Sequence, residues 1–174
     1  HGVVVTSQLR PGDFAGLRRR GARAVIDLGV EGEEPDQPTV REMAGAAQAA
    51  SLSFFYTPTP HGAVPPEVVR DFTAALATIR ANPGAGATEG AEAPIVLFCR
   101  SGARAVRVWA LAEATRPGGM SLEQIERAAT GAGSVLAGAG AFSPQAAIES
   151  RVRAVRPTRG RGCLVMEISW DGGP

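Results

Sequence analysis

One segment constrains the fold of this chain more than any other, the stretch from residue 95 to residue 113. It opens with an apolar run, Ile95-Val96-Leu97-Phe98, that is typical of a buried strand, and its second half has the apolar spacing of a helix. The turn between the two halves reads Cys99-Arg100-Ser101-Gly102-Ala103-Arg104. The segment therefore predicts a strand, a short loop and a helix, with a thiol at the bend.

This loop is a candidate anion site. Successive backbone N–H groups in such a turn point inward, and the helix N-terminus adds partial positive charge. Two arginines add full charges. The same field favours the thiolate of Cys99 over the thiol, so we expect a nucleophile. The residues predicted to bind the anion are Arg100, Ser101, Gly102, Ala103 and Arg104.

Strand and helix patterns alternate along the rest of the chain. Strand patterns occur at residues 3–5, 23–28, 53–57 and 95–98, and helical patterns at residues 11–20, 39–50, 65–82 and about 121–130. Capping boxes begin at Thr39 and Ser121, and Ser143 predicts the start of a last helix. Alternation of this kind predicts an α/β fold, a small parallel sheet flanked by helices, with the loop at the carboxyl edge of a strand.

The size and composition of the chain limit its domain number and the classes of partner that it can bind. Its 174 residues suit one domain, which we place at residues 1–150, followed by a C-terminal extension of unknown role at 151–174. The run at 163–170 fits an edge strand or a tail packed on a partner chain. A net charge of +1 and the lack of a long apolar run predict binding to neither nucleic acid nor membrane. All 18 basic residues are arginine, which is typical of a GC-rich bacterial genome.

The two cysteines are far apart in the sequence. Cys99 and Cys163 therefore predict neither a disulfide framework nor a metal cluster, and we expect no metal and no cofactor. A single reactive thiol fits a reducing compartment, so we expect a cytoplasmic protein, with Cys163 in a structural role. The oligomeric state is left open.

Several motifs resemble those of the bacterial beta-lactamase hydrolase-like phosphatase domains, a family also described as sulfurtransferases. The matching stretches are Ser7-Gln8-Leu9-Arg10-Pro11, Val25-Ile26, Gly32-Glu33-Glu34-Pro35, Gln37-Pro38, residues 99–104 and Trp109-Ala110-Leu111-Ala112. The resemblance covers about residues 6–131. It implies a protein-tyrosine or dual-specificity-phosphatase-like fold, with Cys99 and Arg104 as the catalytic pair.

The chain departs from the family pattern at two places. Gly29-Val30-Glu31 stands where the family usually has Arg-Pro-Asp, and Ala105 stands where a hydroxyl residue usually follows the second arginine of the loop. We interpret Glu31, Glu33 and Glu34 as a solvated acidic turn, and Trp109 as a core residue.

Three observations favour sulfur over phosphate chemistry. Only four residues separate Cys99 from Arg104, as in rhodanese-like loops, whereas tyrosine-phosphatase loops have five. The loop at residues 58–62 has no carboxylate to protonate a leaving oxygen. Ala105 lacks the hydroxyl that helps a phosphatase expel its cysteine. Sulfur transfer needs neither device.

The main prediction is a sulfurtransferase. Cys99 would take sulfur from thiosulfate or a low-molecular-weight persulfide, and a thiol acceptor would collect it. The alternative is a tyrosine or dual-specificity-like phosphatase working through a phosphocysteine, with His61 or Glu31 supplying the proton. A second alternative is a non-catalytic anion-binding or redox-sensing domain. The expected partner is thus a small sulfur or phosphate anion, and His61 is a candidate contact for it.

Overall fold

The structure is a computed structural model that describes residues 2–82, 93–131, 152–154, 158–160 and 163–170. Parallel strands form its centre. The strands run in the order β3-β2-β4-β1-β7-β5, and β6 pairs with β7. Their bounds are β1 Val3–Thr6, β2 Ala24–Asp27, β3 Ser53–Tyr56, β4 Ile95–Phe98, β5 Val152–Ala154, β6 Thr158–Gly160 and β7 Cys163–Trp170.

Strand β4 lies between two parallel neighbours. Ile95 is opposite Val3 of β1 on one side and Ala24 of β2 on the other, and β2 is in turn parallel to β3. This confirms the predicted small parallel sheet of an α/β fold. All residues of β1, β2 and β4 are buried, because both faces of this central part of the sheet are covered.

The run at residues 163–170 is a strand of this sheet. It forms β7, which pairs antiparallel with β1 on one side and with β5 on the other. Of the two arrangements that the sequence left open, the structure therefore shows the strand, although β7 has a neighbour on each side. The domain boundary at residue 150 stays a prediction.

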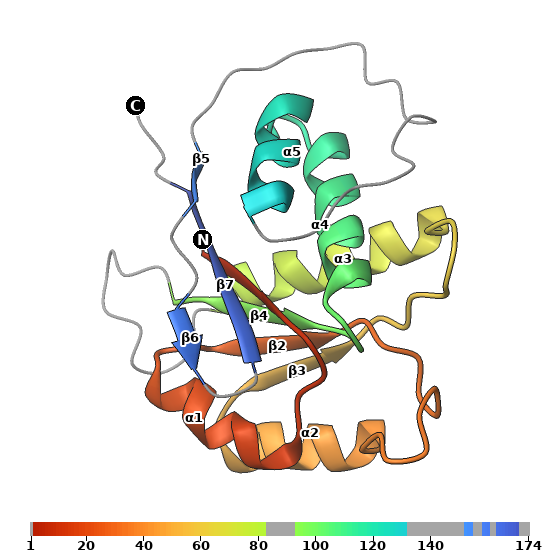
Figure 1. The fold of residues 1–174 in the computed structure, drawn as a ribbon, viewed down its shortest axis with the longest axis vertical. Coiled ribbons are helices and arrows are strands. Elements are labelled where there is room, and N and C mark those ends of the chain that lie inside the picture. Colours follow the sequence, from red (N-terminus) through yellow and green to blue (C-terminus); the bar gives the residue numbers. More distant parts are fainter. Residues whose placement is uncertain (1, 83–92, 132–151, 155–157, 161–162, 171–174) are drawn as a thin grey trace.

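The helices cover the two faces of the sheet (Figure 1). A 3-10 turn η1 (Pro11–Asp13), α1 (Phe14–Arg19) and α2 (Val40–Ala49) pack on one face, and α3 (Pro66–Ala81), α4 (Ala103–Thr115) and α5 (Leu122–Gly131) on the other. These bounds confirm the predicted helices to within a few residues. The helix expected at Ser143 lies outside the described residues.

Both predicted capping boxes are present. Thr39 Oγ1 accepts a hydrogen bond from the Glu42 amide at 3.2 Å, and Glu42 accepts one from the Thr39 amide at 2.8 Å. Ser121 and Gln124 make the same exchange at the start of α5. Each box satisfies N–H groups that a helix start leaves without intrahelical partners.

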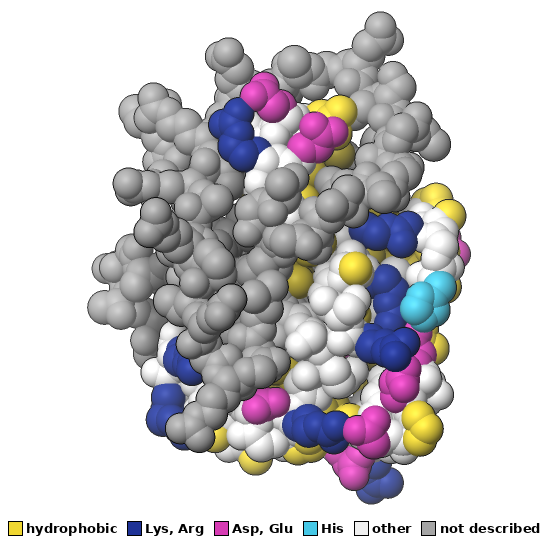
Figure 2. Space-filling model, viewed as in Figure 1, with side chains coloured by type: hydrophobic (Ala, Val, Ile, Leu, Met, Phe, Trp, Pro, Cys, Tyr) yellow, Lys and Arg dark blue, Asp and Glu magenta, His cyan; other side chains and the backbone are white. Residues whose placement is uncertain are grey.

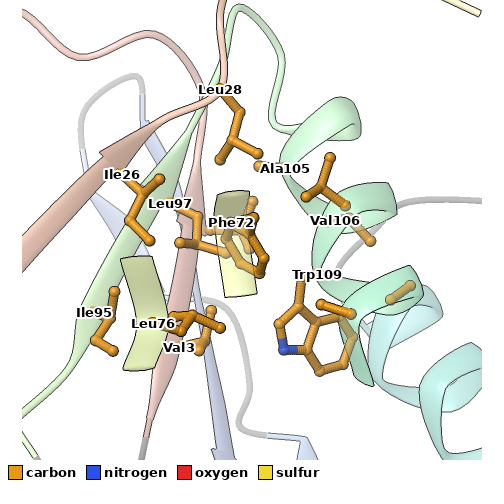
Figure 3. Packing of buried hydrophobic residues seen from close by; sticks show 14 of the residues in the cluster. Val3, Ile26, Leu28, Phe72, Leu76, Ile95, Leu97, Ala105, Val106 and Trp109 are labelled. Carbon is orange, nitrogen blue, oxygen red and sulfur yellow. The ribbon is translucent and has the colours of Figure 1, made fainter. Parts of the chain in front are cut away.

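The larger core lies between the sheet and helices α3, α4 and α5. Figure 3 shows Trp109 of α4 in the same buried cluster as Phe72, Leu76 and the strand residue Leu97. Trp109 is 2% exposed, which confirms that it is a core residue. No helix among the described residues is long and apolar enough to span a membrane.

Candidate active site

Cys99 directly follows β4 and begins the loop that leads into α4. The Gly102 amide points back at the thiol and donates a hydrogen bond to Cys99 Sγ at 3.1 Å. Gly102 is in the left-handed region, with φ of 86°, and a Cβ there would lie 3.3 Å from the Thr6 carbonyl oxygen. Only glycine adopts this conformation without strain, and the turn that aims an amide at the sulfur depends on it.

The N-terminal strand supports the loop from behind. The Gln8 amide donates to the Arg100 carbonyl oxygen at 3.1 Å, and Gly102 packs on Thr6. Cys99 is fully buried. The predicted position of the thiol, at the carboxyl end of a central parallel strand and facing a loop amide, is thus the observed one. Helix α4 starts at Ala103, and the N–H groups of its first turn point out of this end of the helix, toward the loop.

Arg104 is buried and firmly held. Its Nη1 donates to Glu33 Oε1 at 2.6 Å and to the Thr59 carbonyl oxygen at 2.8 Å, and its Nη2 donates to Glu33 Oε2. This fork-to-fork pairing raises the pKa of Arg104 and lowers that of Glu33. The arginine is therefore a permanent charge with a fixed orientation beside Cys99.

Glu33 was expected in a solvated turn, and this expectation is wrong. Its side chain is only 14% exposed and neutralises Arg104. Gln37 fixes the turn that carries it, because Gln37 Oε1 accepts from the Glu33 amide at 2.9 Å and Gln37 Nε2 donates to the Val30 carbonyl oxygen at 3.0 Å. The only sequence signal for this role was the place of Glu33 in a matched motif.

Glu34 and Glu31, the other two glutamates of the turn, have other partners. Glu34 pairs with Arg100 at 2.8 Å near the protein surface. Glu31 accepts a hydrogen bond from the Val40 amide at 2.8 Å, so its carboxylate caps the N-terminus of α2. Glu31 is therefore engaged away from the loop, although the sequence made it a candidate proton donor.

His61 lies in the loop between β3 and α3, with its Nε2 3.2 Å from Glu33 Oε1. Its side chain is 75% exposed. Figure 2 shows a histidine in cyan among arginine and acidic side chains on this face. Arg107 donates to the Gly62 carbonyl oxygen. The loop is thus tied to α4 on both sides of His61, at Thr59 and at Gly62.

The predicted anion-binding residues of the loop differ in exposure. Arg100, Ser101 and Ala103 are exposed, whereas Gly102 and Arg104 are buried. Ser101 Oγ is 3.5 Å from the Ala103 amide. The structure therefore brings together Cys99, Gly102, Arg104 and, through Glu33, His61.

Asp27, at the end of β2, is a buried carboxyl group that no sequence motif indicates. It is 3% exposed, and its Oδ1 accepts from the Gly29 amide at 2.8 Å. Burial raises the pKa of Asp27 to about 6, against the opposing effects of that hydrogen bond and of Arg104. Any side chain at position 29 would crowd the carboxylate, since a Cβ there would lie 3.2 Å from Asp27 Oδ1. A lone aspartate at a strand end carries no sequence signal for such burial.

The family comparison agrees with these features. The sequence model of "Beta-lactamase hydrolase-like protein, phosphatase-like domain" matches residues 1–118. A beta-lactamase hydrolase-like protein of Xylella fastidiosa (strain Temecula1) is 30% identical over 124 residues, which are 71% of this chain. The match spans 26% of that relative, so this chain corresponds to about a quarter of its length.

Solved structures show the same fold. A protein of Neisseria meningitidis described as a candidate phosphatase matches with a TM-score of 0.59 and 21% identity, over 80% of this chain and 89% of that one. The kinase associated phosphatase, with its catalytic cysteine replaced by serine, matches with a TM-score of 0.55 and 16% identity, over 72% and 68%. At these identities the likeness establishes the phosphatase-like fold alone.

Proposed function

Because the chain belongs to the family of phosphatase-like domains found in beta-lactamase hydrolase-like proteins, we propose that it hydrolyses phosphate monoesters through a phosphorylated Cys99. The family is that of a cysteine-based, phosphatase-like domain.

The observation that supports the proposal best is the arrangement around the thiol. The Gly102 amide faces Cys99 Sγ, and Arg104 is held beside it by Glu33 and Thr59. Both groups are placed to stabilise the negative charge on a phosphoryl group in the transition state. Arg104 needs no reorganisation for this, because its orientation is already fixed.

The reaction has two displacement steps. The Cys99 thiolate attacks phosphorus, an S–P bond forms, and the P–O bond to the leaving group breaks. Water then attacks the phosphocysteine, the S–P bond breaks with its electron pair returning to sulfur, and inorganic phosphate departs. The loop amides and Arg104 hold the phosphoryl oxygens throughout.

The sulfurtransferase activity that the sequence favoured finds no support in the comparisons, which fit its phosphatase alternative better. The arguments for it remain the four-residue spacing between Cys99 and Arg104, the absence of a carboxylate at residues 58–62, and Ala105. Phosphate hydrolysis requires no thiol acceptor, so the proposed partner is a small or protein-borne phosphate ester alone.

One experiment separates the two chemistries. The protein is incubated in parallel with p-nitrophenyl phosphate, thiosulfate and glutathione persulfide, quenched rapidly, and weighed intact, with Cys99→Ser as the control. We expect phosphate release and a phosphoryl adduct that Cys99→Ser lacks. A sulfur adduct on Cys99 that cyanide removes catalytically, without phosphate release, would overturn the proposal in favour of sulfur transfer.

A further inference from the structure

One carboxylate oxygen of Glu33 contacts both the exposed imidazole of His61 and the buried guanidinium of Arg104. Glu33 Oε1 accepts from Arg104 Nη1 at 2.6 Å and lies 3.2 Å from His61 Nε2. Building on the proposed function, we infer that His61 is the general acid that protonates the leaving oxygen, and the base that later activates water. Glu33 holds it beside the arginine that binds the phosphoryl group.

The ion pair determines which nitrogen carries the transferable proton. Its hydrogen bonds to Arg104 lower the pKa of Glu33, so the carboxylate is ionised and attracts an N–H group at His61 Nε2. The Nδ1 proton of the imidazolium is then the one available for transfer.

Other acids near the loop are engaged or inaccessible. Glu31 caps α2 through the Val40 amide, and Glu34 pairs with Arg100. Asp27 is buried at 3% exposure and accepts from the Gly29 amide. Among the residues that the structure describes around the loop, His61 combines a link to Arg104 through Glu33 with an exposed ring.

The backbone around His61 is fixed from both sides. Arg104 binds the Thr59 carbonyl oxygen, and Arg107 binds the Gly62 carbonyl oxygen. Two arginines of one helix therefore set the distance between the imidazole and the Cys99 loop. A proton donor placed in this way is already oriented before substrate binds.

The proton balance closes over one turnover. As the P–O bond breaks, the leaving oxygen takes the Nδ1 proton and departs as an alcohol, which leaves neutral His61 and phosphocysteine. The neutral imidazole then removes a proton from water as the oxygen attacks phosphorus. Phosphate leaves, the thiolate is restored, and His61 is protonated again.

The test compares leaving groups of different acidity. The rate of the first leaving-group release is measured by rapid quench on p-nitrophenyl phosphate, phenyl phosphate and phosphoserine, with the full chain and with His61→Gln. Glutamine keeps a hydrogen-bond donor for Glu33 but cannot deliver a proton. Ala63→Gln places the same side chain two residues away as a matched control.

We expect His61→Gln to retain p-nitrophenyl phosphate cleavage within about 3-fold and to lose about 10²-fold or more on phenyl phosphate and phosphoserine, whereas Ala63→Gln follows the wild type. An equal fall on all three substrates would overturn the role of His61 while leaving the phosphatase proposal intact. Absence of cleavage by the wild-type protein would instead refute the phosphatase proposal itself.

Discussion

The site has an inner and an outer ion pair, and the two differ in depth although their residues are neighbours in sequence. The inner pair joins Arg104 to Glu33, with side chains 6% and 14% exposed. The outer pair joins Arg100 to Glu34, with side chains 60% and 37% exposed. One acidic turn and one loop thus supply both pairs.

The comparison indicates that burial, and not the mere presence of opposite charges, decides how much each pair contributes to the stability of the protein. Exposed pairs contribute about 0–1 kcal/mol to stability because water and salt screen them. Breaking a buried pair costs more, since it leaves a charge without its partner. We therefore expect the two arginines to respond very differently to substitution.

The largest effect is expected for Arg104→Lys. Lysine keeps the charge but lacks the planar fork that meets both Glu33 oxygens, so it cannot occupy the same orientation. We expect kcat/KM for p-nitrophenyl phosphate to fall about 10³-fold. Arg100→Lys, measured in parallel, is the control. Similar losses for the two variants would remove the distinction between the inner and outer pairs.

Asp27→Asn tests the effect of burial on a single charge, because Asp27 is a buried carboxylate next to the inner pair. The pKa of Asp27 is raised from 3.8 to about 6 in the folded protein. Between these values the folded state holds a proton that the unfolded state has lost, so Asp27 lowers stability as pH rises from about 4 to about 6.

Asparagine keeps an oxygen for the Gly29 amide and does not ionise. The stability of Asp27→Asn relative to wild type should therefore increase by about 2 kcal/mol between pH 4 and pH 7. Urea unfolding of both proteins across this range measures the difference. A difference that is independent of pH, or that decreases with pH, would show that Asp27 is not a destabilising buried charge.

Gly102→Ala tests the backbone of the inner region. Alanine at a φ of 86° is strained, and its methyl group would press on the Thr6 carbonyl oxygen. We expect a loss of about 1–2 kcal/mol in unfolding free energy. Ser101→Ala, at an exposed position of the same loop, is the control in thermal and urea unfolding. Equal stability of the two variants would mean that the turn does not require glycine.

The smallest effect is expected for Arg100→Ala at the outer pair. Loss of an exposed charge should raise KM by about 3-fold at low salt, and the difference should shrink as salt screens the wild-type protein. Steady-state kinetics at two ionic strengths measure it. A loss of kcat as large as that of Arg104→Lys would place Arg100 in the chemistry itself.

Local features of the site could be predicted from sequence, whereas its long-range pairings could not. The strand before Cys99, the helix after it and the Thr39 capping box follow from residues close together in the chain. The Arg104–Glu33 pair joins residues 71 positions apart, and no spacing rule links them. The burial of Asp27 likewise depends on how distant elements pack around β2.

Strand β4 enters the sheet between two strands that precede it in the chain. β2 and β3 are consecutive and pair directly, whereas β1 has no parallel neighbour until β4 joins it. Contacts between distant segments form late, because closing a long loop costs entropy. Cys99 directly follows β4, and its loop contacts Thr6 and accepts a hydrogen bond from the Gln8 amide. The surroundings of the Cys99 thiol therefore form only when β4 pairs with β1, because Thr6 and Gln8, which hold the loop, belong to the opposite end of the described α/β core in sequence.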